Sequence, residues 1–147
     1  TLMSLAGSEE STQGLLKAYL AANAKDMSAY FSEDVKFLGD SKFIGKNVHM
    51  VDPIALTKEE LSKSYRQLFE KVGKEKWIKL LKNLKPTSQI SKEGGEYKGM
   101  VKKGDIIYDM HLREALKGKR RGLDEAVIFI FRKIGDNYLI VGHVADY

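Results

Sequence analysis

The chain has 147 residues, 43% of them hydrophobic and 31% charged, a balance typical of one globular domain rather than a disordered chain. It contains no cysteine, which excludes disulfides, thiolate metal sites and cysteine nucleophiles. The formal net charge is +5, which we attribute to lysines scattered over a solvated surface. No apolar run reaches the ~18 residues that span a bilayer, so no membrane partner is expected.

The sequence predicts a single domain over residues 1–147, without repeats or a low-complexity linker. It begins Thr1-Leu2-Met3 rather than with an initiator methionine. We expect a cytoplasmic protein, with export after removal of a signal peptide as the alternative.

Helical periodicity dominates the first half of the chain. Residues 8–25 are predicted to form a helix capped by Ser8, and residues 27–32 a short second helix capped by Asp26. Residues 35–37 alternate like the start of a strand. Thr57 and Glu60 have the spacing of a capping box, so a helix should begin there and run to Gly73.

The second half of the chain is predicted to be mainly β. Residues 74–85 fit either a helix or a strand, and we favour a helical extension followed by a strand near 87–91. Glycine-rich turn signals then separate four predicted strands, which cover residues 96–101, 106–116, 124–132 and 138–146. The short turns between them favour an antiparallel meander.

The predicted strand at 124–132 is apolar at every position from Val127 to Phe131. Such a strand should be central in the sheet and covered on both faces. Because one layer of helices covers only one face, we expect a homodimer through the other.

Four segments resemble the nuclear transport factor 2-like superfamily, which includes SnoaL-like and ketosteroid-isomerase-like domains. They are KAYLAANAKD (17–26), YFSEDV (30–35), FIGK (43–46) and GDNYLIV (135–141). The resemblance implies an α+β cone, in which a curved antiparallel sheet wraps around N-terminal helices and encloses a pocket. It implies the pocket and no particular activity.

The catalytic residues of the ketosteroid isomerases do not carry over to this sequence. Aligning the first helix puts Ala18 where the isomerases have a tyrosine, and Tyr19 follows that position by one residue. Gly39 takes the place of the aspartate base. Many members of the superfamily carry a histidine an even number of residues after an aromatic residue of the last strand. Here His143 follows Tyr138 by an odd number, so we expect it to face the other side.

The predicted strand at 106–116 has one polar face, formed by Asp109, His111 and Arg113. The opposite face carries Tyr108, Met110 and Leu112. We predict that Asp109, His111 and His143 form a catalytic cluster inside the cone, with Arg113 holding an anionic group of the ligand. In a simple pairing of the hairpins, His111, Phe129 and His143 lie side by side. The alternative is a solvated outer face, on which Asp109 and Arg113 form a surface pair.

Tyrosine and tryptophan combine an apolar ring with a polar group, and they suit a cavity wall better than other aromatic residues. The residues predicted to line the pocket are Tyr19, Tyr30, Trp77 and Tyr108. Packing in the core is the alternative. The three histidines lack a metal-binding spacing, so neither a metal nor a cofactor is expected. The basic turn at 117–121 is interpreted as solvated, and nucleic acid is an unlikely partner.

Two functions remain open at this point. In the first hypothesis, the domain binds a small apolar molecule and acts as a cofactor-independent acid–base enzyme of the isomerase, dehydratase, cyclase or hydrolase type. The alternative is a non-catalytic ligand-binding or dimerisation module with the same cavity. Inward placement of Asp109, His111 and His143 favours the enzyme, and outward placement favours the module.

Overall fold

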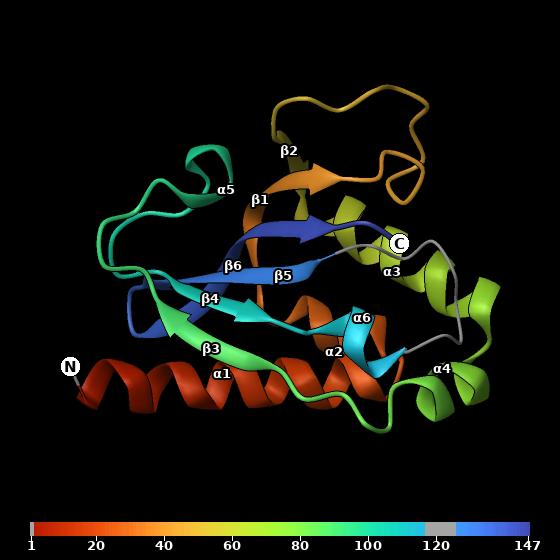
Figure 1. The fold of residues 1–147 in the computed structure, drawn as a ribbon, viewed down its shortest axis with the longest axis horizontal. Coiled ribbons are helices and arrows are strands. Elements are labelled where there is room, and N and C mark those ends of the chain that lie inside the picture. Colours follow the sequence, from red (N-terminus) through yellow and green to blue (C-terminus); the bar gives the residue numbers. More distant parts are fainter. Residues whose placement is uncertain (1, 117–125) are drawn as a thin grey trace.

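The structure, a computed structural model, describes residues 2–116 and 126–147. It has the α+β architecture predicted from the sequence, with four N-terminal helices packed on one face of a twisted six-stranded sheet (Figure 1). No helix among the described residues combines the length and apolar character needed to cross a bilayer.

The elements follow the predicted order in part, but β2, α5 and α6 were not predicted from the sequence. The helices are α1 (Leu2–Leu20), α2 (Ala24–Ser28), α3 (Lys58–Val72), α4 (Lys74–Leu80), α5 (Glu96–Gly99) and α6 (Leu112–Ala115). The strands are β1 (Phe31–Gly39), β2 (Ile54–Thr57), β3 (Thr87–Ile90), β4 (Ile106–Asp109), β5 (Val127–Ile134) and β6 (Asn137–Ala145).

The strands are arranged in the order β2-β1-β6-β5-β4-β3, so β2 and β3 form the two edges. The predicted antiparallel meander is confirmed for β3 to β6. The exception to antiparallel pairing is β1 with β6. These two strands run parallel, so their C-terminal ends lie at the same end of the sheet. This parallel pair brings the loop after β1 next to the chain that follows β6.

Helix α3 confirms the capping box. The Thr57 hydroxyl accepts a hydrogen bond from the backbone N–H of Glu60 at 3.1 Å, and the Glu60 carboxylate accepts one from the N–H of Thr57 at 3.0 Å. The helix ends at Gly73, whose φ of 92° is costly for other residues. Its buried stripe, which includes Leu61, Tyr65 and Phe69, faces the sheet. The favoured helix at 74–85 is confirmed for its first part, as α4, which ends at Leu80.

The first helices differ from their predicted bounds. Helix α1 already begins at Leu2 and ends at Leu20, where Ala22 adopts a φ of 52° and interrupts the helical backbone. The second helix is capped by Asn23, not by Asp26, because the Asn23 side chain accepts a hydrogen bond from the N–H of Asp26.

Two of the predicted strands need correction. The segment 96–101 is a helical turn, α5, in which Tyr97 and Lys98 have φ values of 51° and 58°. The predicted strand at 106–116 ends at Asp109, and His111 adopts a φ of 50° before the short helix α6. The start of the predicted strand at 124–132, like the basic turn at 117–121, lies outside the described residues.

Strand β5 is covered on both faces, as predicted, but the second cover comes from its own chain. The inward side chains Val127, Phe129 and Phe131 join the main core with the helices. The outward Ile128 and Ile130 are buried beneath the segment between β3 and β4, which contributes Tyr97, Met100 and Val101 (Figure 1). A dimer is therefore not needed to bury this face, and the homodimer stays a prediction.

A β-bulge in β6 changes which side chains of this strand face inward. Phe131 pairs with Ile140, whereas the preceding residue, Ile130, pairs with Gly142, so Val141 is an extra residue. The extra residue reverses the alternation after it. His143 therefore faces the same core as Tyr138. It lies inside the cone, as the predicted cluster required, whereas the count from Tyr138 had put it on the other side.

Candidate functional site

His143 is the most deeply buried polar residue inside the cone, with no exposed surface. Its ring stacks on Phe129, with the ring centroids 4.1 Å apart and an angle of 12° between the planes. The two residues are direct neighbours across β5 and β6, as the sequence suggested. Tyr108 rather than His111 lies opposite Phe129 on β4, so the predicted row of His111, Phe129 and His143 is wrong.

Three tyrosines form a chain of hydrogen bonds that begins at His143. The Tyr65 hydroxyl lies 2.5 Å from Nε2 of His143 and 2.9 Å from the Tyr147 hydroxyl. The Tyr147 hydroxyl lies 2.7 Å from the hydroxyl of Tyr19. We call Tyr19, Tyr147, Tyr65 and His143 the Tyr–His network.

One backbone carbonyl fixes the direction of every hydrogen bond in the Tyr–His network. Nδ1 of His143 lies 2.7 Å from the carbonyl oxygen of Ile128, and a carbonyl can only accept. Nδ1 therefore carries the proton, and Nε2 accepts a hydrogen bond from the Tyr65 hydroxyl. Tyr147 must then donate to Tyr65, and Tyr19 to Tyr147. Each hydroxyl proton is committed to the next member of the network.

Burial keeps the whole Tyr–His network uncharged. It lowers the pKa of His143 from 6.5 to about 3, against the opposing effect of the hydrogen bond to Ile128. Burial also raises the pKa of Tyr19, Tyr65 and Tyr147 well above 10.0, and the proximity of these hydroxyls to one another adds to the effect. The imidazole is neutral and the phenols are protonated at any physiological pH.

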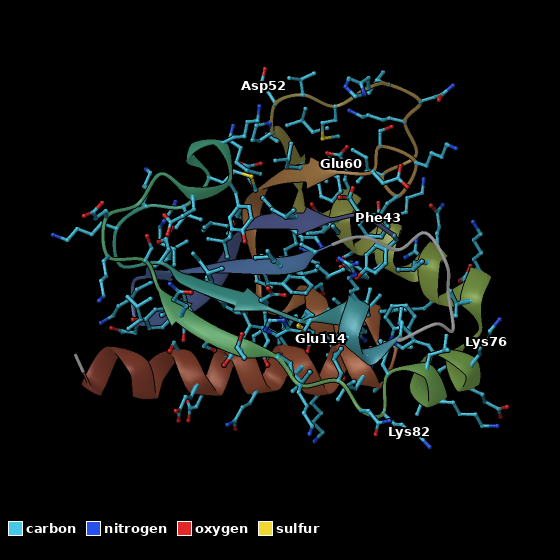
Figure 2. The ribbon with its side chains drawn as sticks, viewed as in Figure 1. Phe43, Asp52, Glu60, Lys76, Lys82 and Glu114 are labelled. Carbon is cyan, nitrogen blue, oxygen red and sulfur yellow. The ribbon has the colours of Figure 1, made fainter. Side chains whose placement is uncertain are left out.

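A pocket of about 440 Å³ opens beside the C-terminal ends of the parallel strands β1 and β6. We call it the mouth pocket. Its lining residues are Asp40, Lys42, Phe43, Ser64, Gln67, Leu68, Lys71 and Tyr147. Those from α3 recur at helical spacing and form one face of that helix. Figure 2 shows Phe43 between α3 and the end of the chain.

Tyr147 connects the mouth pocket to the Tyr–His network. It is half-buried, and its ring lies 5.0 Å from that of Phe43, while its hydroxyl belongs to the network. Neither Tyr65 nor Tyr147 was selected from the sequence. The signal for Tyr65 was a tyrosine in the otherwise apolar stripe of α3, because a buried hydroxyl needs a partner. For Tyr147 the sequence offered no signal.

The predicted pocket-lining residues occupy different parts of the core. Tyr19 and Trp77 are buried together, and the Trp77 indole donates a hydrogen bond to the Tyr19 carbonyl at 2.7 Å. Tyr108 packs edge-on against Phe131, and Tyr30 is half-buried beside α1. None of these four residues lines the mouth pocket.

Asp109 and His111 lie together, but away from His143 and from the mouth pocket. Their side chains are about a third exposed, and Nδ1 of His111 is 3.8 Å from the Asp109 carboxylate. Nε2 of His111 lies 2.7 Å from the Thr87 hydroxyl. Arg113 is exposed on α6. Tyr108, Met110 and Leu112, which form the opposite face of the predicted strand, lie in the main core.

This arrangement does not bring the predicted catalytic residues together, because the strand expected to align them stops at Asp109. Within the described part of the chain, no group of three or more histidine and acidic side chains could hold a metal ion.

Comparison with known proteins identifies the fold. The sequence matches no protein-family model, and it matches no curated protein. Among solved structures, the protein is similar to an NTF-2-like protein of unknown function from Shewanella oneidensis, with a TM-score of 0.52. Sequence identity is 14%, over 97% of this chain and 98% of that one. This chain has the nuclear transport factor 2-like fold.

Two further structures agree on the fold. A DUF4783 family protein from Bacteroides ovatus has a TM-score of 0.51 at 13% identity, over 90% of this chain and 91% of that one. A domain of unknown function with a cystatin-like fold from Nostoc punctiforme has a TM-score of 0.50 at 12% identity. That match covers 98% of this chain and 76% of the other. At such identities the similarity extends to the fold and not to function.

Proposed function

We propose that the protein is a small-molecule-binding domain whose ligand occupies the mouth pocket. The observation that carries this proposal is a pocket of about 440 Å³ whose lining combines three apolar or aromatic side chains with five polar or charged ones. Ligand sites typically measure ~300–1,000 Å³ and have this mixed lining.

The lining favours an apolar ligand with one polar or anionic group. Phe43, Leu68 and Tyr147 offer flat or branched apolar surfaces to a ring. The amide of Gln67 and the ammonium groups of Lys42 and Lys71 could hold a carboxylate or another acceptor at the rim.

Binding without catalysis is favoured because the Tyr–His network lacks a group suited to acid–base work. An efficient general acid or base has a pKa near the working pH. Burial moves the pKa of His143 down to about 3 and those of the three phenols well above 10.0. The hydroxyl protons are also committed within the network. We infer that the network supports the wall of the pocket.

An acid–base enzyme that uses His111 is a second candidate, and one local observation favours it. His111 contacts the Thr87 hydroxyl at 2.7 Å, and its φ of 50° is the kind of strain that concentrates at functional sites. Against it, the 3.8 Å between Nδ1 of His111 and Asp109 is too long for a hydrogen bond. With a turnover assay in hand, His111→Ala should abolish activity at unchanged melting temperature if this version holds.

The binding proposal is tested by ligand-observed NMR with a library of small aromatic and alicyclic acids. Gln67→Trp should fill the mouth pocket from the exposed face of α3, and Gln89→Trp makes the same change on the exposed edge strand β3. We expect compounds that bind the unmodified protein and Gln89→Trp but not Gln67→Trp. An absence of binders, or equal binding by the two variants, would contradict the proposal.

A further inference from the structure

The net positive charge of the protein comes from one segment of the chain, not from lysines scattered over the whole sequence. Residues 71–85 contain six lysines and one glutamate, which give this segment a net charge of +5. The rest of the chain contains 19 basic and 19 acidic residues, so the segment carries the whole net charge of the protein. The lysines are Lys71, Lys74, Lys76, Lys79, Lys82 and Lys85, and all are exposed.

Packing of α4 explains why these lysines share a surface. Trp77 is 2% exposed, and Leu81 and Leu84 on the following turn are also buried, so this side of the segment faces the core. The lysines between them in sequence, Lys79 and Lys82, are exposed on the other side. Figure 2 shows Lys76 and Lys82 at the α4 end of the molecule, projecting away from the fold. We call the six lysines together with Ile78 the lysine surface.

The charge of the lysine surface is not neutralised by neighbouring residues. Within residues 2–116 and 126–147, none of the six lysines forms an ion pair with a carboxylate. Glu75 is the only acidic residue in the segment. Such a surface attracts polyanions from a distance of about one Debye length.

Ile78 lies among these lysines and is 45% exposed, one of few large apolar side chains exposed to this extent. Lys74 precedes it by four residues, one turn of α4, and the exposed Lys79 follows it directly, so an apolar side chain lies among cations. A membrane interface accommodates this combination: the lysines contact headgroup phosphates while the apolar side chain enters the acyl boundary.

We propose that the lysine surface binds the surface of an anionic membrane, with Ile78 inserting between the lipids. Peripheral binding of this kind rests on charge and on the inserted side chain. Nucleic acid fits the residues less well, because recognition of its phosphates and bases favours arginine and exposed aromatic rings. The segment contains no arginine, and its one aromatic residue, Trp77, is buried.

The test is co-sedimentation with vesicles of phosphatidylcholine, either pure or containing about one third phosphatidylserine. We expect binding to the anionic vesicles alone. Each lysine near such a surface contributes roughly a fivefold gain in affinity, so a triple variant with Lys76→Gln, Lys79→Gln and Lys82→Gln should bind about 100-fold more weakly. Ile78→Ser should weaken binding roughly fivefold through lost insertion.

The matched control removes three exposed lysines elsewhere, through Lys36→Gln, Lys92→Gln and Lys133→Gln, and reaches the same net charge. It should keep nearly all of the affinity. An equal loss in the control, no effect of Ile78→Ser, or no binding of the unmodified protein to anionic vesicles would each overturn the proposal. Binding to a single-stranded RNA oligonucleotide without vesicle binding would assign the surface to nucleic acid and would also overturn it. Circular dichroism melting checks that every variant is folded.

Discussion

Tyr65 is the residue on which the Tyr–His network depends, since it donates to His143 and accepts from Tyr147. Removing its hydroxyl leaves an acceptor nitrogen on the fully buried His143 and a donor on the half-buried Tyr147 without partners. Tyr65→Phe should therefore lower the free energy of unfolding by about 1–3 kcal/mol, as measured by urea denaturation.

Tyr138→Phe is the matched control for this change. Tyr138 is also buried, but its hydroxyl forms no hydrogen bond with a described residue. Its loss should change stability by less than about 0.5 kcal/mol. Equal effects of the two substitutions would mean that the network contributes nothing beyond packing.

His143 makes stability depend on pH in a defined direction. Its pKa is lowered in the folded state, from 6.5 to about 3. Between these two pH values the imidazole is protonated in the unfolded chain and neutral in the folded one. The stabilising contribution is complete above pH 6.5 and is lost as the pH falls from there toward 3. Its slope is at most about 1.4 kcal/mol per pH unit.

This pH dependence is measured by urea denaturation between pH 7 and 5, a range chosen to lie above most carboxylate titrations. His143→Gln keeps a donor and an acceptor but cannot titrate. The unmodified protein should lose stability more steeply than His143→Gln as the pH falls. Parallel curves for the two proteins would show that His143 is not held neutral by the fold.

Single residues were predictable from the sequence only where their position relative to the sheet did not matter. Tyr19 and Trp77 were predicted to line a pocket, with core packing as the alternative, and both pack in the core. The count from Tyr138 put His143 on the wrong side, because a bulge at Val141 adds a residue that simple alternation cannot reveal. Tyr147 was missed because its role arises from contacts more than 80 residues away in sequence.

Secondary-structure elements were predictable where a local interaction determines them. Helix α3 begins with a capping box formed by side chains three residues apart, which can be read directly from the sequence. Strand β4 ends at Asp109 and not at residue 116 as predicted, for an equally local reason that the sequence analysis did not include. The Asp109 side chain accepts a hydrogen bond from the N–H of His111 at 2.9 Å, which turns the chain out of the sheet.

The α5 turn is an element that ordinary propensities do not predict, because Tyr97 and Lys98 both adopt left-handed backbone angles. Lys98 is exposed, so its substitution tests the backbone alone. Lys98→Gly should raise the free energy of unfolding by about 0.5–1 kcal/mol, since relief of left-handed strain exceeds the entropic cost of glycine. Thermal and urea denaturation measure this gain.

Lys103→Gly provides the control in the same segment. Lys103 is also exposed, but its φ is negative, so glycine there brings only the entropic cost. We expect a loss of about 0.5–1 kcal/mol. If both glycine variants are destabilised to the same degree, the left-handed turn holds no strain.

At the scale of the whole molecule, one loop determines which apolar surface reaches solvent. The segment between β3 and β4 lays Met100 and Val101 over Ile128 and Ile130 of β5. The sequence correctly predicted that both faces of β5 are buried, but assigned the second cover to a partner chain. Composition cannot distinguish these cases, because a covering loop and a covering subunit both bury the same residues.

Asp105 links the segment between β3 and β4, which we call the cover, to Arg132 of β5. Removing the Asp105 carboxylate should expose the outer face of the sheet. Its carboxylate accepts two hydrogen bonds from the Arg132 guanidinium, at 2.9 and 2.7 Å, and one from the N–H of Lys102 at 2.8 Å. Asp105→Ala leaves Arg132 able to reach water, because that side chain is 29% exposed. We therefore expect a loss of about 1–3 kcal/mol rather than the larger cost of a fully buried charge.

Loosening of the cover should also change how the molecules associate. Ile128 and Ile130 would then offer an apolar patch for a second chain, so light scattering of Asp105→Ala should give a mass that rises with concentration above that of the unmodified protein. Hydrogen exchange at the amides of β4 and β5 should accelerate in parallel. Asp136→Ala, at the exposed turn between β5 and β6, is the control and should leave both measurements unchanged. If Asp105→Ala keeps the mass and the exchange rates of the unmodified protein, the cover is held by its apolar contacts and not by the Asp105–Arg132 pair.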